Sequence, residues 1–444
     1  MMLVSRGRAR AYAAVGLPRP ARLARPRGAP LCTVAAPAPA PPVAVAPVDE
    51  TLSVAPMMDY TCRHFRHLMR LLSSRAVLYT EMVVANAVQH NLGDLERWYG
   101  CTDGHEHGAP RDVLQLGGSD AAMLALASRA ALAYPYSAIN LNCGCPSERV
   151  AGSGAFGASL MRDPAHVAAL CAAMADATGG ALPISVKCRI GVDDDDSYEQ
   201  LRAFVDAVSA GGGVRHFIVH ARKAILNMKL SPADNRKIPP LRPELVHALV
   251  ADYAGAGLRF TLNGGITSLT DARAQLDASP RLAGVMIGRD VINRPFYYAH
   301  ADRVLYGCAD ARARAPPSRG DVLAAYAAYA RQQLQLGARE SGLLKPVHNL
   351  FHGEAGGRAF RRQLARTLDE HGARAAVLAL EDVAAACVPD RVLSARADER
   401  APDAPEREAE RAAGVGVGVG TSSAGMDASH SLSHAERGVQ SYVC

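Results

Sequence analysis

Residues 140–147 read NLNCGCPS and hold a cysteine where it could do chemistry. Residues 138–141 begin as a mostly apolar strand, and the Gly–Cys–Pro sequence after them predicts a turn that ends it. Cys145 is therefore expected on a loop at the carboxyl end of a strand, where barrel enzymes carry their reactive groups. It could donate a proton, attack a substrate or be a structural loop residue. Cys143, just beyond the strand, is expected to be a buried, inert thiol.

Other residues suited to ligand contact follow the remaining strand-like segments where each strand would end. They are Met57, Met58, Gln115, Asn142, Lys187, His220, Asn263, Gly264, Gly265, Gly288 and Arg289. Burying Lys187 is costly without an anionic partner. It could pair with an acid such as Asp193, or stabilise negative charge on an electron-rich ring as the ring is reduced. Gln115 would hydrogen-bond that ring, and His220 could contact ring or substrate or be structural.

Two consecutive loops carry glycines suited to a phosphate group. Gly264 and Gly265 end the seventh strand-like segment, and Gly288 with Arg289 ends the eighth. Bare backbone N–H groups at helix N-termini cradle phosphate, and an arginine adds charge-assisted hydrogen bonds. Each pair alone is more often a turn. Together they predict a cofactor or substrate that bears phosphate.

The elements that would position these residues alternate regularly. Eight apolar segments predict strands at 52–55, 77–80, 113–116, 138–142, 184–188, 216–220, 259–263 and 284–287. Helical segments lie between them, at 121–133, 164–177, 198–210, 243–251 and 269–276. Eight strands with intervening helices predict a (β/α)8 barrel of the α/β class. A doubly wound sheet would need phosphate-binding glycines after its first strand, where the chain instead has Ala-Pro-Met-Met.

The chain divides into four regions. Residues 1–48 hold seven Arg, no Lys and no acid, which predicts an organellar transit peptide or a disordered extension. Residues 49–309 form the expected barrel. Residues 310–382 form a small helical module, with helices expected at 321–336, 345–350 and 358–368; residues 310–380 hold eleven Lys or Arg against six acids. Residues 383–444 are expected to be a disordered tail, whose Gly/Val run lacks the context of a phosphate loop.

Composition limits the classes of protein and the partners. The formal net charge of +6 is concentrated in the N-terminal arm and the helical module rather than spread over the chain. No uninterrupted apolar run is long enough to span a membrane. The ten cysteines show no zinc-ligand spacing, so we expect no metal site and a reducing compartment. We expect a monomer without a membrane partner, sent to the chloroplast or mitochondrion, with the cytoplasm as the alternative.

Several segments, in the same order, resemble the tRNA-dihydrouridine synthases. They include APMMDYTCR at 55–63, YTEM at 79–82, the cysteine segment at 141–147, SVKCRIG at 185–191, HARKA at 220–224, NGGI at 263–266 and GR at 288–289. The segment LSPADNRKIPP at 230–240 is similar to the A-type branch of the family. The resemblance covers about residues 51–375. It implies an FMN-binding barrel followed by a helical tRNA-binding domain.

The resemblance also implies roles for individual residues. Cys145 would be the proton donor. FMN would be contacted by Pro56, Met57, Met58, Gln115, Lys187, His220, Asn263, Gly264, Gly265, Gly288 and Arg289. The tRNA would be contacted by Asn142, Arg236, Arg358 and Arg361. Ala233 departs from the family pattern, because a lysine that meets tRNA is expected there.

The implied reaction reduces the C5=C6 bond of D-loop uridines at positions 20 and 20a. NADPH reduces FMN, the reduced flavin delivers hydride to C6, and a neutral Cys145 thiol protonates C5 of the flipped-out base. The basic helices would bind the tRNA backbone, although Arg358, Arg361, Arg362 and Arg366 could instead be a solvated helix face. Two other functions remain open: an FMN-dependent reductase of free pyrimidines or other small substrates, and a non-catalytic tRNA-binding or tRNA-folding protein.

Overall fold

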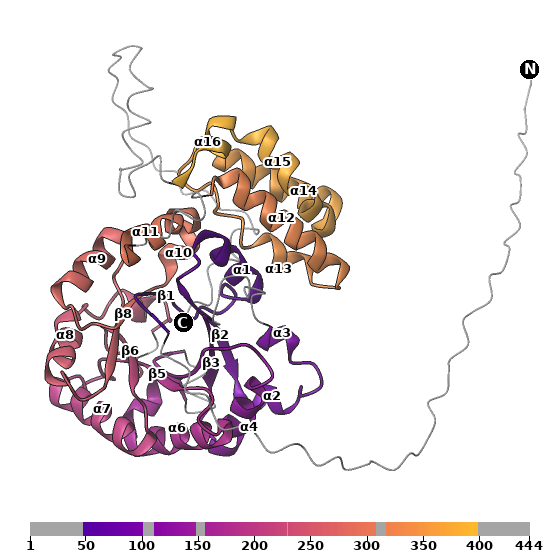
Figure 1. Ribbon diagram of the computed structural model, residues 1–444. Coiled ribbons are helices and arrows are strands. Elements are labelled where there is room, and N and C mark those ends of the chain that lie inside the picture. The colour runs from indigo at the N-terminus through magenta and orange to yellow at the C-terminus, as the bar shows by residue number, and fades with distance from the viewer. Residues whose placement is uncertain (1–47, 101–110, 148–155, 229, 308–316, 398–444) are drawn as a thin grey trace, which may run out of the picture. The chain divides into compact units, whose positions relative to one another are not determined.

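Eight parallel strands close into a barrel in the computed structural model, which describes residues 48–100, 111–147, 156–228, 230–307 and 317–397 (Figure 1). Each strand pairs in parallel with the next one along the chain, and β1 pairs with β8. The strands are β1 (Leu52–Val54), β2 (Val77–Val84), β3 (Asp112–Gly117), β4 (Ala138–Cys143), β5 (Ile184–Arg189), β6 (His216–His220), β7 (Arg259–Asn263) and β8 (Gly284–Ile287). The expected (β/α)8 barrel is confirmed.

Helices surround the barrel and bury its outer face. Those between the strands are α1 (Arg63–Leu72), α2 (Ala85–Gln89), α3 (Glu96–Tyr99), α4 (Ala121–Ala131), α6 (Pro164–Thr178), α7 (Tyr198–Gly212), α8 (Pro243–Asp252) and α9 (Leu269–Ala278), with 3-10 turns η2 (Gly157–Arg162) and η3 (Asp234–Arg236). α10 (Arg289–Asn293), η4 (Pro295–His300) and α11 (Ala301–Tyr306) follow β8. Local sequence explains several starts: Asp120, Asp163, Ser197 and Ser268 each cap a helix by accepting a backbone N–H.

A bulge interrupts the pairing of β2 with β3 between Tyr79 and Met82. At this point the Thr80 hydroxyl accepts the backbone N–H of Gln115 at 3.0 Å. The bulge lengthens β2 to Val84, four residues beyond the expected end at 80. Bulges of this kind re-aim side chains beside functional sites.

The helical module packs against α1 of the barrel. Its helices are α12 (Arg319–Gln335), α13 (Glu340–Leu344), α14 (Gly357–Leu378), α15 (Leu380–Cys387) and α16 (Asp390–Ser394). Tyr329 of α12 stacks on His67 of α1 with ring centroids 3.8 Å apart, and its hydroxyl lies 2.8 Å from Nδ1 of His64. α14 is kinked at Gly372, whose φ of 84° lies outside the helical region.

Two expectations for this module differ from the structure. Residues 345–350 form turns rather than a helix, because Pro346 cannot continue the helix that ends at Leu344. The module also continues beyond residue 382, where we expected the tail to begin. Val383, Val388 and Val392 are buried and extend its core through α16. The expected transit peptide, the boundary near 310 and the tail after 397 lie outside the described residues.

Within the described ranges no helix is long and apolar enough to cross a membrane. Nor does any group of three His, Cys, Asp or Glu side chains there have an arrangement that could hold a metal ion.

Candidate active site

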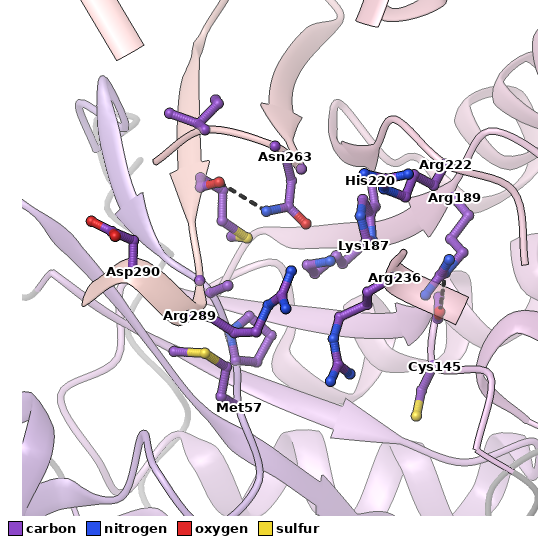
Figure 2. Close-up of a pocket in the computed structure, with 18 of the residues that line it drawn as sticks. Met57, Cys145, Lys187, Arg189, His220, Arg222, Arg236, Asn263, Arg289 and Asp290 are labelled. Atoms are coloured by element: carbon purple, nitrogen blue, oxygen red, sulfur yellow. Dashed lines mark hydrogen bonds between the residues drawn. The ribbon is translucent and has the colours of Figure 1, made fainter. Parts of the chain in front are cut away.

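A cavity of about 320 Å³ is lined by residues from the carboxyl ends of the strands (Figure 2). Its volume falls within the range of small-molecule sites. The expected residues that line it are Pro56, Met57, Asn142, Cys145, Lys187, His220, Arg236, Asn263, Gly264, Gly265, Gly288 and Arg289. Met58 and Gln115 are not among the lining residues, nor are Arg358 and Arg361 of α14.

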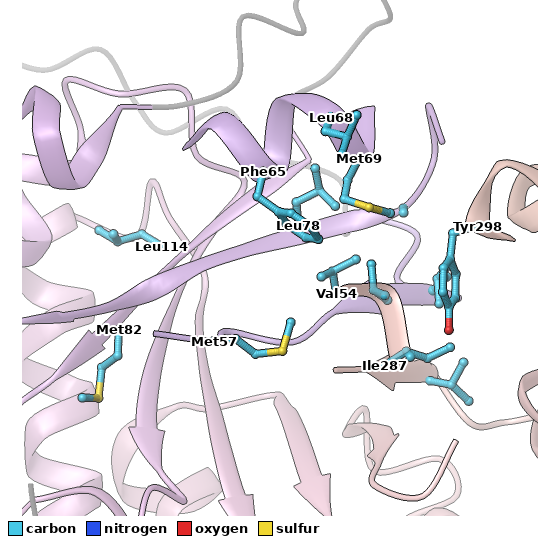
Figure 3. Close-up of a cluster of buried hydrophobic side chains, with 14 of the residues drawn as sticks. Val54, Met57, Phe65, Leu68, Met69, Leu78, Met82, Leu114, Ile287 and Tyr298 are labelled. Atoms are coloured by element: carbon cyan, nitrogen blue, oxygen red, sulfur yellow. The ribbon is translucent and has the colours of Figure 1, made fainter. Parts of the chain in front are cut away.

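Met57 connects the cavity to the barrel core. It is almost completely buried and belongs to the same apolar cluster as Val54, Leu78 and Ile287 (Figure 3). The hydroxyl of Thr61 accepts the backbone N–H of Met57 at 2.9 Å. The loop after β1 is therefore fixed by both packing and hydrogen bonding at the cavity wall.

The turn that carries Cys145 is held from two sides. Oδ1 of Asn142 accepts the backbone N–H groups of Gly144 and Cys145, at 3.1 and 3.0 Å. On the other side, Nε of Arg189 donates to the carbonyl oxygen of Gly144 at 2.9 Å (Figure 2). The peptide unit between Gly144 and Cys145 is thus hydrogen-bonded at both its N–H and its C=O. Cys145 lines the cavity and is only 3% exposed, so it is shielded from bulk water.

The two glycines after β7 stand where any side chain would collide with a neighbour. Gly264 has a φ of +106°, and a Cβ there would lie 2.6 Å from the ring of His220. Gly265 has a φ of +76°, and its Cβ would lie 2.4 Å from Leu241. L-residues with a side chain rarely adopt such φ values. These two positions therefore bring bare backbone to the cavity wall beside His220.

Positive charge dominates the cavity. Its described lining includes five cations, Lys187, Arg189, Arg222, Arg236 and Arg289, and one carboxylate, Asp290. That carboxylate already accepts hydrogen bonds from Arg294, at 3.0 and 3.2 Å, and from the hydroxyl of Tyr298 at 2.7 Å. Such a lining favours an anionic ligand.

Burial and the nearby positive charges together keep His220 neutral. Burial, followed by the neighbouring cations Arg189 and Lys187, holds the pKa of His220 well below its usual value. His220 is therefore neutral at physiological pH and can donate or accept one hydrogen bond at each ring nitrogen. A neutral imidazole adds no further positive charge to the cavity.

The proposed ion pair between Lys187 and Asp193 is not found. Asp193 instead forms an ion pair with Arg162 and accepts the backbone N–H groups of Leu226 and Asn227 at 2.7 and 3.0 Å. Lys187 lines the cavity.

Gln115 lies in the barrel interior, and its side chain is already hydrogen-bonded at both ends. Its Oε1 accepts from Asn142 at 2.9 Å, and its Nε2 donates to Asn140 at 2.8 Å. Gln115 is 1% exposed. It supports the residue that holds the Cys145 turn.

Arg189 and Arg222 were missed as site residues, although the sequence held a signal for both. Arg189 follows Lys187 by two positions on β5, and alternate residues of a strand face the same side. Arg222 follows His220 by two positions just after β6, and its Nη1 donates to the carbonyl of Pro239. The remaining cavity residues that were not expected are Ala55, Gly144, Ile266, Thr267, Met286, Asp290 and Asn293.

The arginines of α14 form a separate group on the surface of the helical module. Arg358, Arg362 and Arg366 are exposed and recur every four residues, and Arg361 is half-buried. Phe360 and Leu364 anchor the opposite face of the helix in the core. Arg366 pairs with Glu370 at 2.8 Å.

A parallel barrel with a cationic cavity at the carboxyl ends of its strands has the arrangement of the barrel enzymes, whose active sites lie at this face. Residues 53–386 match the model of the family described as dihydrouridine synthase (Dus). The chain belongs to this family.

Curated relatives agree with this assignment over most of their own length. The tRNA-dihydrouridine(20/20a) synthase of Xanthomonas campestris pv. campestris is 46% identical over 333 residues, covering 75% of this chain and 93% of the relative. The protein of the same name from Escherichia coli strain K12 is 42% identical over 326 residues, covering 73% and 89%. The resemblance to the A-type branch of the family is confirmed. The old yellow enzyme homologue of Zymomonas mobilis is 12% identical, with a TM-score of 0.41 over 56% of this chain and 88% of that chain.

Proposed function

We propose that this protein reduces the C5=C6 bond of uridines in the D-loop of tRNA, at positions 20 and 20a, to give dihydrouridine. Family membership supports the reaction. The observation that carries the proposal is the turn of Cys145, which places a thiol in the wall of a cationic cavity. The peptide unit between Gly144 and Cys145 is hydrogen-bonded at both its N–H and its C=O, so the turn is fixed.

The residues of the cavity fit a phosphate-bearing flavin, FMN. The five cations suit its phosphate, and Gly264 and Gly265 present a cradle that a Cβ would fill. The lining residues that would hold it are Pro56, Met57, Lys187, His220, Asn263, Gly264, Gly265, Gly288 and Arg289. When bound, FMN would supply C6 of the uracil with a hydride that originates from NADPH.

The protein's own residues would supply the proton and orient the base. The Cys145 thiol donates its proton to C5, so that the C5=C6 π bond becomes two C–H bonds while NADPH is oxidised to NADP⁺. Solvent then reprotonates the sulfur. Asn142 and Arg189 keep the thiol in place during this step, and preorganisation of that kind lowers the barrier. Asn142 also lines the cavity and is a proposed contact to the tRNA. Lys187 would stabilise negative charge on the flavin ring when the flavin is reduced.

The base must leave its stack to enter the cavity, which costs little for an unpaired loop nucleotide. Arg236 in the cavity wall, and Arg358 and Arg361 on α14, are the proposed contacts to the tRNA backbone. Such contacts make the affinity dependent on salt. The Arg-rich, acid-free first 48 residues support delivery to a chloroplast or mitochondrion.

The decisive experiment incubates the purified full chain with NADPH and unmodified tRNA and maps dihydrouridine at nucleotide resolution. We expect flavin absorbance that bleaches with NADPH and returns on addition of tRNA, with new dihydrouridine in the D-loop. Turnover of free uracil that persists after deletion of the helical module, residues 317–397, would support the small-substrate reductase. Tight tRNA binding without any dihydrouridine would support the non-catalytic alternative.

A further inference from the structure

A chain of side-chain hydrogen bonds runs from the Cys145 turn into the barrel interior. Nδ2 of Asn142 donates to Oε1 of Gln115 at 2.9 Å, and Nε2 of Gln115 donates to Oδ1 of Asn140 at 2.8 Å. Nδ2 of Asn140 then donates to the hydroxyl of Ser185 at 2.9 Å, and this hydroxyl lies 3.3 Å from the carbonyl of Ile139. We call Asn142, Gln115, Asn140 and Ser185 the amide ladder.

Every donor in the amide ladder points away from the Cys145 turn. At the turn, Oδ1 of Asn142 faces two backbone N–H groups, so its Nδ2 must face Gln115. This requires Gln115 to present its oxygen to Asn142 and its nitrogen to Asn140. Asn140 in turn presents oxygen to Gln115 and nitrogen to Ser185. One consistent orientation of three amides therefore satisfies all of these groups.

The ladder lies where water cannot substitute for a lost partner. Asn140 is fully buried, Gln115 is 1% exposed, and Ser185 and Asn142 are 4% and 5% exposed. A buried polar group that loses its partner costs free energy, whereas a fully connected network holds one arrangement. Asn140 and Ser185 do not line the cavity, and the hydrogen bonds of the ladder connect them to it through Gln115 and Asn142.

We propose that Asn140, supported by Ser185, is a positioning residue for the Cys145 turn: it accepts the hydrogen bond of Gln115 and so keeps Gln115 in the place from which it fixes Asn142. Without an acceptor at position 140, Nε2 of Gln115 is buried without a hydrogen-bond partner, and Gln115 can regain one only by leaving its position. Asn142 then loses its acceptor at Gln115, and its side chain is no longer fixed against the turn. The hydrogen bonds to Gly144 and Cys145 weaken although no residue of the cavity has changed.

The test uses two variants at one position. Asn140→Leu is nearly isosteric and removes the acceptor that Gln115 needs. Asn140→Asp keeps that acceptor: burial favours the protonated carboxyl group, whose C=O can accept from Gln115 while its O–H donates to the hydroxyl of Ser185. Ser185→Ala removes the acceptor for Nδ2 of Asn140 but leaves the acceptor for Gln115, so its effect should be smaller than that of Asn140→Leu. Thr261→Val is the matched control, because Thr261 is fully buried and bonds His216 at 2.8 Å outside the ladder.

The main readout compares two half-reactions in the purified, flavin-loaded full chain. Flavin reduction by NADPH does not need the Cys145 proton, whereas flavin reoxidation by tRNA does. The ratio of the reoxidation rate to the reduction rate therefore cancels losses from poor folding or low flavin content. In Asn140→Leu we expect this ratio to fall about tenfold or more, given how strongly rates depend on placement of the reacting group. In Ser185→Ala we expect a smaller fall, and in Asn140→Asp and Thr261→Val a ratio within about threefold of wild type.

A second readout does not depend on catalysis. Iodoacetamide labelling of the thiol at position 145, followed by peptide mass spectrometry, reports whether the turn has opened. We expect several-fold faster labelling of Cys145 in Asn140→Leu than in Thr261→Val, with Cys143 unchanged in both. An unchanged rate ratio in Asn140→Leu, or an equal fall in Asn140→Leu and Thr261→Val, would overturn the inference.

This inference rests on the proposed function, but the two fail differently. A wild-type protein that forms no dihydrouridine in tRNA refutes the function. A wild-type protein that forms it, together with Asn140→Leu showing normal ratio and labelling, refutes only the role of Asn140.

Discussion

Nε of Arg189 donates to the carbonyl oxygen of Gly144 at 2.9 Å, and this bond joins the fifth strand of the barrel to the turn that carries Cys145. Nη1 of the same side chain donates to the carbonyls of Lys223 and Asn235, at 2.9 and 3.0 Å. One buried guanidinium therefore connects the Cys145 turn with two points of the loop between β6 and α8. Arg236 of that loop lines the cavity. The proposed proton donor and a proposed tRNA contact are thus held by the same side chain.

Arg189→Lys tests this support, because it keeps the charge but a single ammonium group cannot reach all three carbonyls. We expect reoxidation of the reduced flavin by tRNA to slow about tenfold or more, with flavin reduction by NADPH much less affected. Stopped-flow absorbance measures both rates. Arg70→Lys is the matched control: Arg70 also donates to three backbone carbonyls, of Ser73, Ser74 and Ala76, away from the cavity. Equal slowing in both variants would mean that general destabilisation is the cause.

Cys145→Ala removes the proposed proton donor. General acid catalysis contributes about 10²- to 10⁴-fold, so we expect dihydrouridine formation to fall by that amount while NADPH still bleaches the flavin. Quantitative mass spectrometry of the digested tRNA measures the product. Cys143→Ala changes a fully buried neighbouring thiol that does not line the cavity, and it is expected to keep most of the activity. A Cys145→Ala variant that modifies tRNA at the normal rate would exclude the proton-donor role.

Gly264→Ala is expected to lower flavin binding, because its Cβ would lie 2.6 Å from the His220 ring and its φ is +106°. Gly255→Ala has a comparable φ of +87° with no atom within 4 Å of the added Cβ, so it carries the backbone strain without the collision. The ratio of flavin to protein absorbance after purification measures the effect. We expect a clear loss in Gly264→Ala and none in Gly255→Ala. Similar flavin content in the two variants would remove the argument for a cradle at Gly264.

Arg358→Gln and Arg361→Gln remove proposed contacts to the tRNA backbone. Each phosphate contact contributes about one unit to the slope of log affinity against log salt, or slightly less for single strands. We expect each variant to bind tRNA more weakly and to reduce this slope by about one, measured by fluorescence anisotropy at several salt concentrations. Arg391→Gln, at an exposed position of α16, is the control. Unchanged slopes in the α14 variants would favour a solvated helix face.

The lowered pKa of His64 should make the stability of the protein depend on pH. Burial, followed by Arg63, His67 and Arg66, lowers the pKa of His64 to about 4 from its ordinary value of 6.5. Between these values the unfolded chain binds a proton that the folded chain does not, so the free energy of unfolding falls as the pH decreases from about 6.5 to about 4. The loss amounts to about 3 kcal/mol at most.

His64→Gln keeps a hydrogen-bonding partner for Tyr329 but removes the titration. Denaturant unfolding at about pH 7.5 and about pH 5 measures the effect, and we expect a smaller difference between the two pH values in the variant than in wild type. Identical pH dependence in both proteins would show that His64 titrates normally.

The fold could be predicted from the sequence because parallel barrel strands are buried on both faces and appear as short apolar runs. Strands β6, β7 and β8 begin and end where expected. The end of β2 could not be predicted, since a bulge is set by pairing with β3 and not by the residues of β2 alone. The predicted end of the helical module, at residue 382, was too early, because Val383 and Val388 are buried only by residues distant in the sequence.

The candidate site was predictable where a residue type implies a role, and less so where a role depends on contacts across the barrel. Cys145, Lys187 and the glycines after β7 and β8 line the cavity as their positions at strand ends indicated. Arg189 could have been predicted as a cavity residue, because it lies two positions after Lys187 on the same strand. The role of Asn140 has no signature in the sequence, because it depends on three other side chains from β3, β4 and β5.

The concentration of five cations around one cavity also bears on how much of the protein accumulates in a cell. Like charges so close together repel one another, and an anion that binds among them relieves the repulsion in the folded chain only. Binding to the folded state alone stabilises it in proportion to the logarithm of ligand concentration. The supply of phosphate-bearing cofactor would then control the lifetime of newly made protein, and cofactor shortage would lower the amount of the protein as well as its activity.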